Sequence, residues 1–283
     1  MKKEGSIRTA RIADNIITYI FLIIISLIFL FPCVWLIAAS FSKSGDIHSF
    51  SGFFPKEFSA QTFVDLFTDD VNGLYPYGRW FLNTLYVATM TCIIGTLLTI
   101  LTGYVMSRFR FQGRDTIRKT TLLLGMFPGF MGMTAVYIIM GQLNLLNSLE
   151  SLIFYYSCTA PLGYLVQKGY FDSIPYTIHE AATIDGAGYF TRITRIVLPY
   201  MRSVISVVIT MAIIENFKQF PLIWTMTGGG PSNSTTTLAI LSYREAFVSQ
   251  NLGSGAAVTT IWMLLMILVV AVFKKIVGRQ QAE

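Results

Sequence analysis

The chain has 283 residues, of which 53% are hydrophobic and only 13% are charged. Soluble domains have about a quarter of their residues charged, so this composition and the mean hydropathy of +0.59 indicate a protein that crosses a membrane several times. The net charge of +6 does not indicate a nucleic-acid partner, because the basic residues lie in short segments between apolar stretches.

Long uncharged stretches predict six transmembrane helices, since each supplies most or all of the ~20 residues that a spanning helix needs. The fourth stretch is short and contains Pro161 and Gly163, which predicts a tilted or broken helix. The fifth is interrupted by Glu215 and Lys218. We expect an all-α membrane protein with one transmembrane domain over residues 1–283 and spans at about 15–41, 80–107, 120–142, 151–168, 202–226 and 255–274.

The distribution of basic residues predicts the orientation of these spans. Sixteen Lys and Arg residues fall in the terminal segments and loops of one side, and only four fall on the other. Because short cytoplasmic loops carry an excess of Lys and Arg, both termini and the loop at residues 172–199 are expected to be cytoplasmic. The first outer loop, at about residues 43–79, contains Phe63, Leu66 and Phe67 around Asp65, which predicts a short amphipathic helix.

The loop at residues 172–199 is charged and therefore cannot cross the bilayer core, where each central charge costs roughly 3 kcal/mol. Pro175 favours the start of a helix, and Thr177 and Glu180 have the spacing of a capping box. Gly186 and Gly188 are expected to stop this first helix in the left-handed conformation.

A second helix is predicted to follow and to end at Pro199. The helical spacing of four of its residues predicts that they share one face: Phe190, Ile193, Thr194 and Val197. On periodicity alone, the two helices form an ordinary hairpin between membrane spans.

The detailed order of residues in this hairpin is more specific. Glu180-Ala181-Ala182, then Ile184-Asp185-Gly186-Ala187, then Ile196-x-Leu198-Pro199 closely resembles the EAA loop of the membrane permease subunits of binding-protein-dependent ABC importers. In that family the loop forms a coupling helix that docks into a cleft on a separate ATPase subunit. The resemblance implies that the ATPase-coupling residues here are Glu180, Ala181, Ala182, Ile184, Asp185, Gly186, Ala187 and Gly188.

The resemblance extends to the carbohydrate-importer permeases over nearly the whole chain. FPCVWLIAASF after the first span and WFLNTLYVATMTCIIGTLLTILTGYVMSRFR at residues 80–110 are similar to the corresponding segments of the maltose-type second permease subunit. The run GGGP-SNSTTTL is more similar to the partner subunit. The family fold is that of the type I ABC importer permease, with six transmembrane helices and a cytoplasmic EAA loop.

The implied function is that of one transmembrane half of an ATP-driven importer for a sugar, expected to be an oligosaccharide, in the bacterial inner membrane. Its implied partners are a second homologous permease, two ATPase subunits and an extracellular solute-binding protein. The chain has no GxxxxGK[ST] sequence, so it is not expected to be an enzyme. ATP and Mg²⁺ would be bound by the partner ATPase, and no cofactor or metal is expected in this chain.

Polar residues in the fifth span are candidates for the translocation path. Glu215 lies about 12 residues, or roughly 18 Å, into the helix, and its spacing from Lys218 allows an ion pair. This pair either braces the helix or lines a pore, since ionisable residues at depth usually face a bundle interior or an aqueous cavity. The complete set of candidate pore residues is Glu215, Asn216, Lys218, Gln219, Phe220 and Trp224.

A glycine-rich run, Gly228-Gly229-Gly230-Pro231, lies on the predicted outer side. It lacks the Lys-Ser/Thr ending of a phosphate-binding loop, so we expect a flexible loop leading into a helix over residues 235–249. The family resemblance implies that Gly228, Gly229, Gly230 and Pro231 contact the solute-binding protein.

Other interpretations of the sequence remain open. A secondary transporter would use Glu215 as a proton-coupled carboxylate, although no inverted repeat is visible. A membrane-embedded enzyme would need a catalytic constellation, and the chain has neither HExxH nor GxSxG. Within the ABC importers, glycerol phosphate is an alternative solute.

Overall fold

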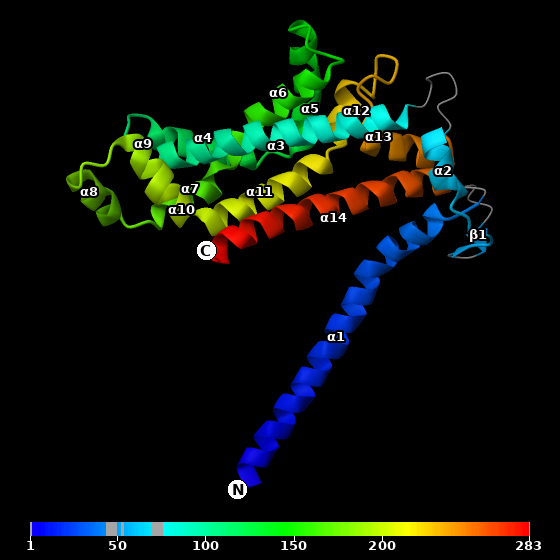
Figure 1. Ribbon diagram of the computed structural model, residues 1–283, viewed down its shortest axis with the longest axis horizontal. Coiled ribbons are helices and arrows are strands. Elements are labelled where there is room, and N and C mark those ends of the chain that lie inside the picture. The colour runs from blue at the N-terminus through cyan, green and yellow to red at the C-terminus, as the bar shows by residue number, and fades with distance from the viewer. Residues whose placement is uncertain (1, 44–49, 52–53, 69–75, 283) are drawn as a thin grey trace. The chain divides into compact units, whose positions relative to one another are not determined.

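The computed structural model describes residues 2–43, 50–51, 54–68 and 76–282 (Figure 1). Parts of the first predicted outer loop therefore lie outside the described residues. The chain divides into two compact units, one formed by residues 1–75 and 242–261 and the other by residues 76–241 and 262–283. Within the described residues, helices make up most of both units, and the first unit also has a short β-hairpin.

The first unit begins with a long helix, α1 (Lys2–Ser40), whose apolar side chains from Ile16 onward are largely exposed, as expected for a lipid-facing span. A two-stranded antiparallel hairpin follows, β1 (Phe50–Ser51) and β2 (Phe54–Pro55). Helix α2 (Gln61–Thr68) confirms the predicted short helix of the outer loop. The same unit contains the end of α13 (Leu238–Tyr243), the π-helical segment η5 (Arg244–Val248) and the start of α14 (Leu252–Ala282).

In the second unit, α3 (Tyr77–Arg108) is the central element. It packs against α6 (Leu149–Thr159), the 3₁₀ turn η3 (Ala160–Gly163), α7 (Tyr164–Asp172) and α11 (Arg202–Phe217). The remaining helices of this unit are α4 (Arg114–Gly125), α5 (Gly129–Gln142), α8 (Tyr176–Ile184), α9 (Tyr189–Arg192), α10 (Leu198–Tyr200) and α12 (Pro221–Met226).

Two glycines allow α3 to lie close to its neighbours. A Cβ atom at Gly95 would be 3.0 Å from the Cβ of Ala160, and one at Gly103 would be 2.9 Å from the Cβ of Gln167. Small residues at such contacts let membrane helices pack by direct van der Waals contact. The core around α3 is completed by a buried cluster that includes Val87, Leu152, Ile153, Leu222 and Ile223.

The structure agrees with some predicted spans and changes others. Four segments of the described chain are long and apolar enough to cross a membrane: Asn15–Ser40, Tyr77–Arg108, Arg202–Met226 and Leu252–Val277. The fourth predicted span is broken by η3 at Pro161 and Gly163, as expected. The predicted span over 120–142 is interrupted, because α4 ends at Gly125 and α5 starts after Pro128, whose missing N–H and fixed φ interrupt a helix.

Candidate coupling loop and membrane groove

The charged loop at residues 172–199 is anchored on the C-terminal end of α3. Its base is a buried cluster of Tyr104, Phe171, Ile174, Val197 and Met201. Tyr104 and Phe171 meet edge to face, with ring centroids 5.4 Å apart. In Figure 1, α8 and α9 extend beyond this end of α3, and α12 lies at its other end.

Arg108 joins the last turn of α3 to the main chain that enters the loop. Its Nη2 donates hydrogen bonds to the carbonyl oxygens of Phe171, at 2.5 Å, and of Ile174, at 3.1 Å. Phe171 lies in the last turn of α7 and Ile174 follows the helix, whose last carbonyl groups have no partner within the helix itself. Arg108 therefore closes the end of α7 and fixes the direction in which the loop leaves it.

Replacing Arg108 with alanine is expected to destabilise the loop base, because the Ile174 carbonyl would lose its donor, and a buried carbonyl left unpaired costs about 1–3 kcal/mol. The Phe171 carbonyl would still accept from the Ile174 N–H. Thermal unfolding of the purified protein in detergent would show a lower melting temperature. Arg110→Ala is the matched control, since Arg110 is exposed two residues further along and should change little. Equal melting temperatures for the two variants would contradict the role given to Arg108.

Asp172 is the second polar anchor of the loop base. Partial desolvation favours its protonated form, but hydrogen bonds from Lys168 and Ser107 outweigh this and lower the pKa of the carboxyl group. Ser107 Oγ donates to Asp172 Oδ1 at 2.6 Å, and Lys168 forms an ion pair with the other carboxylate oxygen. The carboxylate thus links α3 to the last turn of α7.

The lowered pKa predicts how the stability of this link depends on pH. A carboxylate whose folded-state pKa lies below its unfolded value of about 3.9 stabilises the fold above that pH, and this stabilisation is lost as the pH falls through the folded-state pKa. Asp172→Asn is expected to lower the melting temperature at neutral pH by an amount worth less than about 1 kcal/mol, since the group is half exposed, and to match wild type in acid. A difference that persists in acid would refute this. Asp115→Asn, in an exposed ion pair, is the control.

Helix α8 ends on Gly186, as the sequence predicts. Gly186 has a φ of +75°, and its N–H donates to the carbonyl of Thr183 at 3.1 Å, while the N–H of Ala187 donates to that of Ala182 at 2.9 Å. This pair of bonds closes a helix on a left-handed residue.

Two details of the loop prediction were wrong. Gly188 does not have the left-handed backbone that we expected. The capping box is absent, because α8 is capped at Pro175 and Thr177 already lies inside the helix.

The second half of the loop is helical and continues without a break from α9 to α10. Helix α9 passes into the π-helical segment η4 (Ile193–Val197), in which the N–H of Leu198 bonds to the carbonyl of Ile193, and then into α10. Helix α10 continues to Tyr200, so the expectation that Pro199 ends the helix was wrong. Arg192 Nη1 donates to Thr183 Oγ1 at 2.7 Å and holds the two halves of the loop together.

The residues implied as coupling contacts lie on an accessible loop. Glu180, Ala181, Ile184, Asp185, Gly186 and Gly188 are exposed, Ala187 is half-buried and Ala182 is buried. Ile184 is 86% exposed and Phe190 is 77% exposed. Two large apolar side chains in this position beside charged residues are typical of a contact surface for another protein.

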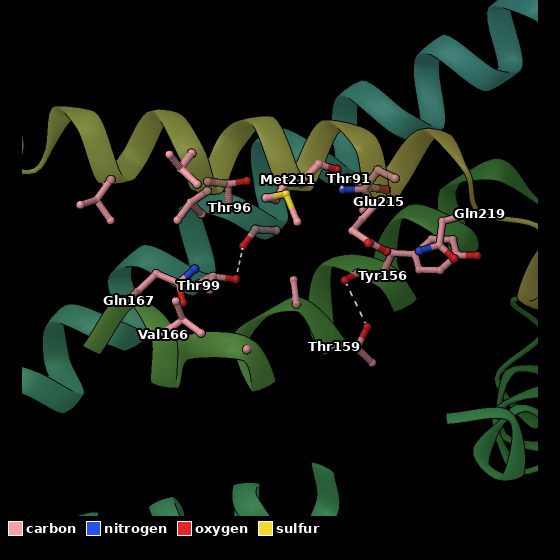
Figure 2. Close-up of a pocket in the computed structure, with 18 of the residues that line it drawn as sticks. Thr91, Thr96, Thr99, Tyr156, Thr159, Val166, Gln167, Met211, Glu215 and Gln219 are labelled. Carbon is pink, nitrogen blue, oxygen red and sulfur yellow. Dashed lines mark hydrogen bonds between the residues drawn. The ribbon is translucent and has the colours of Figure 1, made fainter. Parts of the chain in front are cut away.

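A groove of about 520 Å³ lies between α3, the α6–α7 segment and α11. Its α11 wall is a stripe at helical spacing that runs from Val204 through Met211 to Glu215. Figure 2 shows Met211 and Glu215 on the α11 side, with Thr159, Val166 and Gln167 on the opposite side. Ten of its nineteen lining residues are polar: Thr91, Thr96, Thr99, Tyr156, Thr159, Gln167, Tyr170, Glu215, Asn216 and Gln219.

Three of the six predicted pore residues line this groove, namely Glu215, Asn216 and Gln219. Lys218 is absent from the lining but forms the predicted ion pair, with its Nζ 2.7 Å from Glu215 Oε1. Phe220 and Trp224 stack on each other with ring centroids 5.8 Å apart, and they are not part of the groove wall.

Sequence reasoning missed the polar residues that α3 and α7 contribute. Thr91, Gly95 and Thr99 recur at intervals of four along α3, a small and polar stripe within an apolar helix. That pattern is visible in the sequence. Gln167 on α7 is followed by Lys168 and is part of no such repeat, so it gives no comparable signal.

The glycine-rich outer loop is held on the N-terminal end of α3 rather than being a flexible connection, which corrects our expectation. Asn83 Nδ2 donates to the carbonyls of Ser234, at 2.8 Å, and Thr236, at 3.0 Å. Trp80 Nε1 donates to the carbonyl of Asn233 at 3.0 Å, and the N–H of Leu238 donates to Thr84 Oγ1 at 2.9 Å.

Within this loop, the four predicted contact residues differ in accessibility. Gly228 and Gly229 have φ values of +54° and +90°, and they turn the chain after α12. Gly229 is buried, Gly228 and Gly230 are half-buried, and Pro231 is exposed. Pro231 therefore offers the largest accessible share of its surface.

The chain is similar in sequence to membrane components of known transport systems. Residues 6–282 match the family model described as binding-protein-dependent transport system inner membrane component. The maltodextrin transport system permease protein MalD of Streptococcus pneumoniae is 34% identical over 223 residues, which are 77% of this chain and 76% of that protein. The galactooligosaccharides transport system permease protein GanQ of Bacillus subtilis is 30% identical over 205 residues, 72% of this chain and 71% of that protein.

Solved structures share the fold. A chain of a bacterial ABC transporter involved in the import of the acidic polysaccharide alginate superposes with a TM-score of 0.75 and 16% sequence identity, covering 92% of this chain and 95% of that chain. A bacterial alginate ABC transporter in complex with a pentasaccharide-bound periplasmic protein gives a TM-score of 0.69 at 19% identity, covering 93% of each chain.

Proposed function

Because the chain belongs to the family of binding-protein-dependent transport system inner membrane components, we propose that it forms one transmembrane half of an ATP-driven importer for a sugar. A second, homologous permease would supply the other half of the pore. The protein would lie in the bacterial inner membrane with both termini in the cytoplasm. The observation that carries this proposal is the family match over residues 6–282.

The relatives support a sugar as the solute. Those compared above are named for the transport of maltodextrin and galactooligosaccharides, and the superposed structure is of an alginate importer. An oligosaccharide delivered by a solute-binding protein at the Gly228–Pro231 loop would then enter a path that includes Glu215, Asn216 and Gln219. Lys218 would neutralise Glu215 beside that path, and Phe220 and Trp224 would support the helix break next to it.

Coupling to the ATPase is assigned to the helix and turn at residues 180–188. The exposed Ile184 side chain would insert into a cleft on the ATPase, and Glu180 and Asp185 would make polar contacts at its edge. Ala182 would pack behind this surface. ATP and Mg²⁺ would be held by the two ATPase subunits, whose closure would push the loop and, through Arg108, move α3 as a rigid body.

Reconstitution tests this proposal directly. The two permeases, the ATPase and the binding protein are placed in proteoliposomes, and uptake of a radiolabelled oligosaccharide is measured with and without ATP. Uptake that requires ATP and survives a protonophore is expected. Uptake driven by a proton gradient without ATP would instead support a secondary transporter using Glu215, and uptake of glycerol phosphate alone would replace the sugar.

A further inference from the structure

We propose that the groove between α3, α7 and α11 is a subsite that contacts an uncharged, hydroxyl-rich segment of the transported sugar. This inference rests on the proposed function and adds a direct role for this subunit, together with residues that sequence reasoning did not single out. Its volume of about 520 Å³ lies within the range of roughly 300–1,000 Å³ that ligand pockets occupy.

Several buried polar side chains of the groove have atoms without a hydrogen-bond partner in the chain. Thr91 is 2% exposed and Gln167 is 9% exposed, yet Thr91 Oγ1 and Gln167 Oε1 accept or donate no hydrogen bond, and the same holds for the Tyr156 hydroxyl. An unsatisfied polar group at membrane depth costs several kcal/mol. A hydroxyl group of a ligand in the groove could supply the hydrogen bond that each of these atoms lacks within the chain.

The chemistry of these atoms selects the partner. The Gln167 oxygen only accepts hydrogen bonds, while the Thr91 and Tyr156 hydroxyls both donate and accept. A sugar hydroxyl also does both, so it can satisfy all three. The valines, alanines and methionine among the lining residues suit the C–H faces of a sugar ring, in keeping with pockets that are mostly apolar with few polar groups.

The charge of the groove argues for an uncharged solute. Its lining residues include the carboxylate of Glu215 and no Lys or Arg. Lys218 is already paired with Glu215 and lies outside the lining. The Glu215–Lys218 pair is neutral overall, so an anionic sugar would lose its hydration in the groove without meeting an unpaired cation in the wall, and burying an unpaired charge is costly.

The position of Gln167 is fixed by the close approach of α3 and α7. A Cβ atom at Gly103 would lie 2.9 Å from the Cβ of Gln167 and 3.3 Å from the backbone nitrogen of Lys168. The two helices therefore leave Gln167 no freedom to move toward α3. This contact fixes the position of the Gln167 Cβ atom, from which the amide reaches the groove, and binding sites are most precise when their side chains start from rigid elements.

Cysteine labelling tests the subsite in the assembled transporter. In a variant in which Cys33, Cys92 and Cys158 are replaced by alanine, Val166→Cys and Met211→Cys are introduced singly, because these side chains line the groove and are 62% and 55% exposed. Ile93→Cys and Leu97→Cys on α3 are the matched controls, because these side chains are similarly exposed, at 59% and 56%, but do not line the groove. The rate of reaction with a charged, membrane-impermeant maleimide is measured in proteoliposomes.

Groove cysteines are expected to react at least tenfold faster than the controls. Maltotriose, an uncharged trisaccharide, should slow their reaction, whereas a triuronate of the same length should not. Absence of labelling would overturn the subsite, because it means that protein or lipid seals the groove. Labelling that maltotriose does not slow would overturn sugar contact, and equal protection by the triuronate would overturn the preference for uncharged sugars.

The outcome is separable from that of the proposed function. If the cysteine-free complex takes up oligosaccharide with ATP but the groove cysteines are not protected, only the subsite is wrong. If it takes up no sugar at all, the proposed function is wrong whatever the labelling shows.

Discussion

Replacing Gly186 with proline is expected to abolish ATP-driven uptake. Gly186 has a φ of +75°, whereas proline is restricted to about −65°. Proline would also remove the N–H that donates to the carbonyl of Thr183. Helix α8 would no longer end at residue 184, and the exposed Ile184 side chain would lose its position in the contact surface.

A graded series makes this prediction sharper. Gly186→Ala retains the N–H but places a Cβ atom in the left-handed conformation, at a cost of roughly 1–2 kcal/mol, so it should reduce uptake without abolishing it. Gly169→Ala, on α7 and outside the coupling residues, should transport normally, because its Cβ atom would meet nothing within 4 Å and its φ lies outside the left-handed range. Uptake in proteoliposomes and co-purification of the ATPase are the measurements. Normal uptake by an assembled Gly186→Pro complex would disprove the assignment of the loop.

Asn83→Leu is expected to release the outer loop from α3. The Asn83 amide donates to the carbonyls of Ser234 and Thr236, and leucine donates to neither. With each buried carbonyl left unpaired at a cost of about 1–3 kcal/mol, the fold should lose roughly 2–6 kcal/mol. Because the loop carries Gly228–Pro231, stimulation of ATP hydrolysis by the solute-binding protein should fall as well.

The control for Asn83 is its neighbour on α3. Leu82 is 63% exposed and makes none of these hydrogen bonds, so Leu82→Ala should leave both the melting temperature and the stimulated ATPase rate close to wild type. The two variants are compared by thermal unfolding in detergent and by ATPase assays of the complex with and without binding protein. An Asn83→Leu protein as stable and as responsive as Leu82→Ala would show that the loop does not depend on this anchor.

Features set by neighbouring residues could be predicted from the sequence. The helix end at Gly186, the break near Pro161 and the Glu215–Lys218 ion pair each depend on spacings of a few residues, and each is present. Pro128 was a comparable local signal, but the apolar run around it was interpreted by hydropathy alone and its effect on the helix was missed. The general membrane fold followed from composition and charge.

Features that depend on distant residues could not be predicted in the same way. Asn83 contacts carbonyls about 150 residues further along the chain, and main-chain acceptors leave no trace in the sequence. Gln167 becomes part of the groove only because Gly103 lets α3 approach α7. Residues that act through tertiary packing therefore need the folded chain before their roles can be stated.

The hydrogen bonds at the two ends of α3 have a mechanical consequence. Asn83 forms hydrogen bonds with the outer loop, and Arg108 forms hydrogen bonds with the start of the charged loop. About 25 helical residues separate Asn83 from Arg108, a distance of roughly 37 Å along the helix. Because an α-helix resists stretching, the distance between Asn83 and Arg108 stays constant. A displacement of the charged loop along the axis of α3 would therefore move the outer loop by the same distance. This coupling needs no rearrangement of the side chains between the two ends.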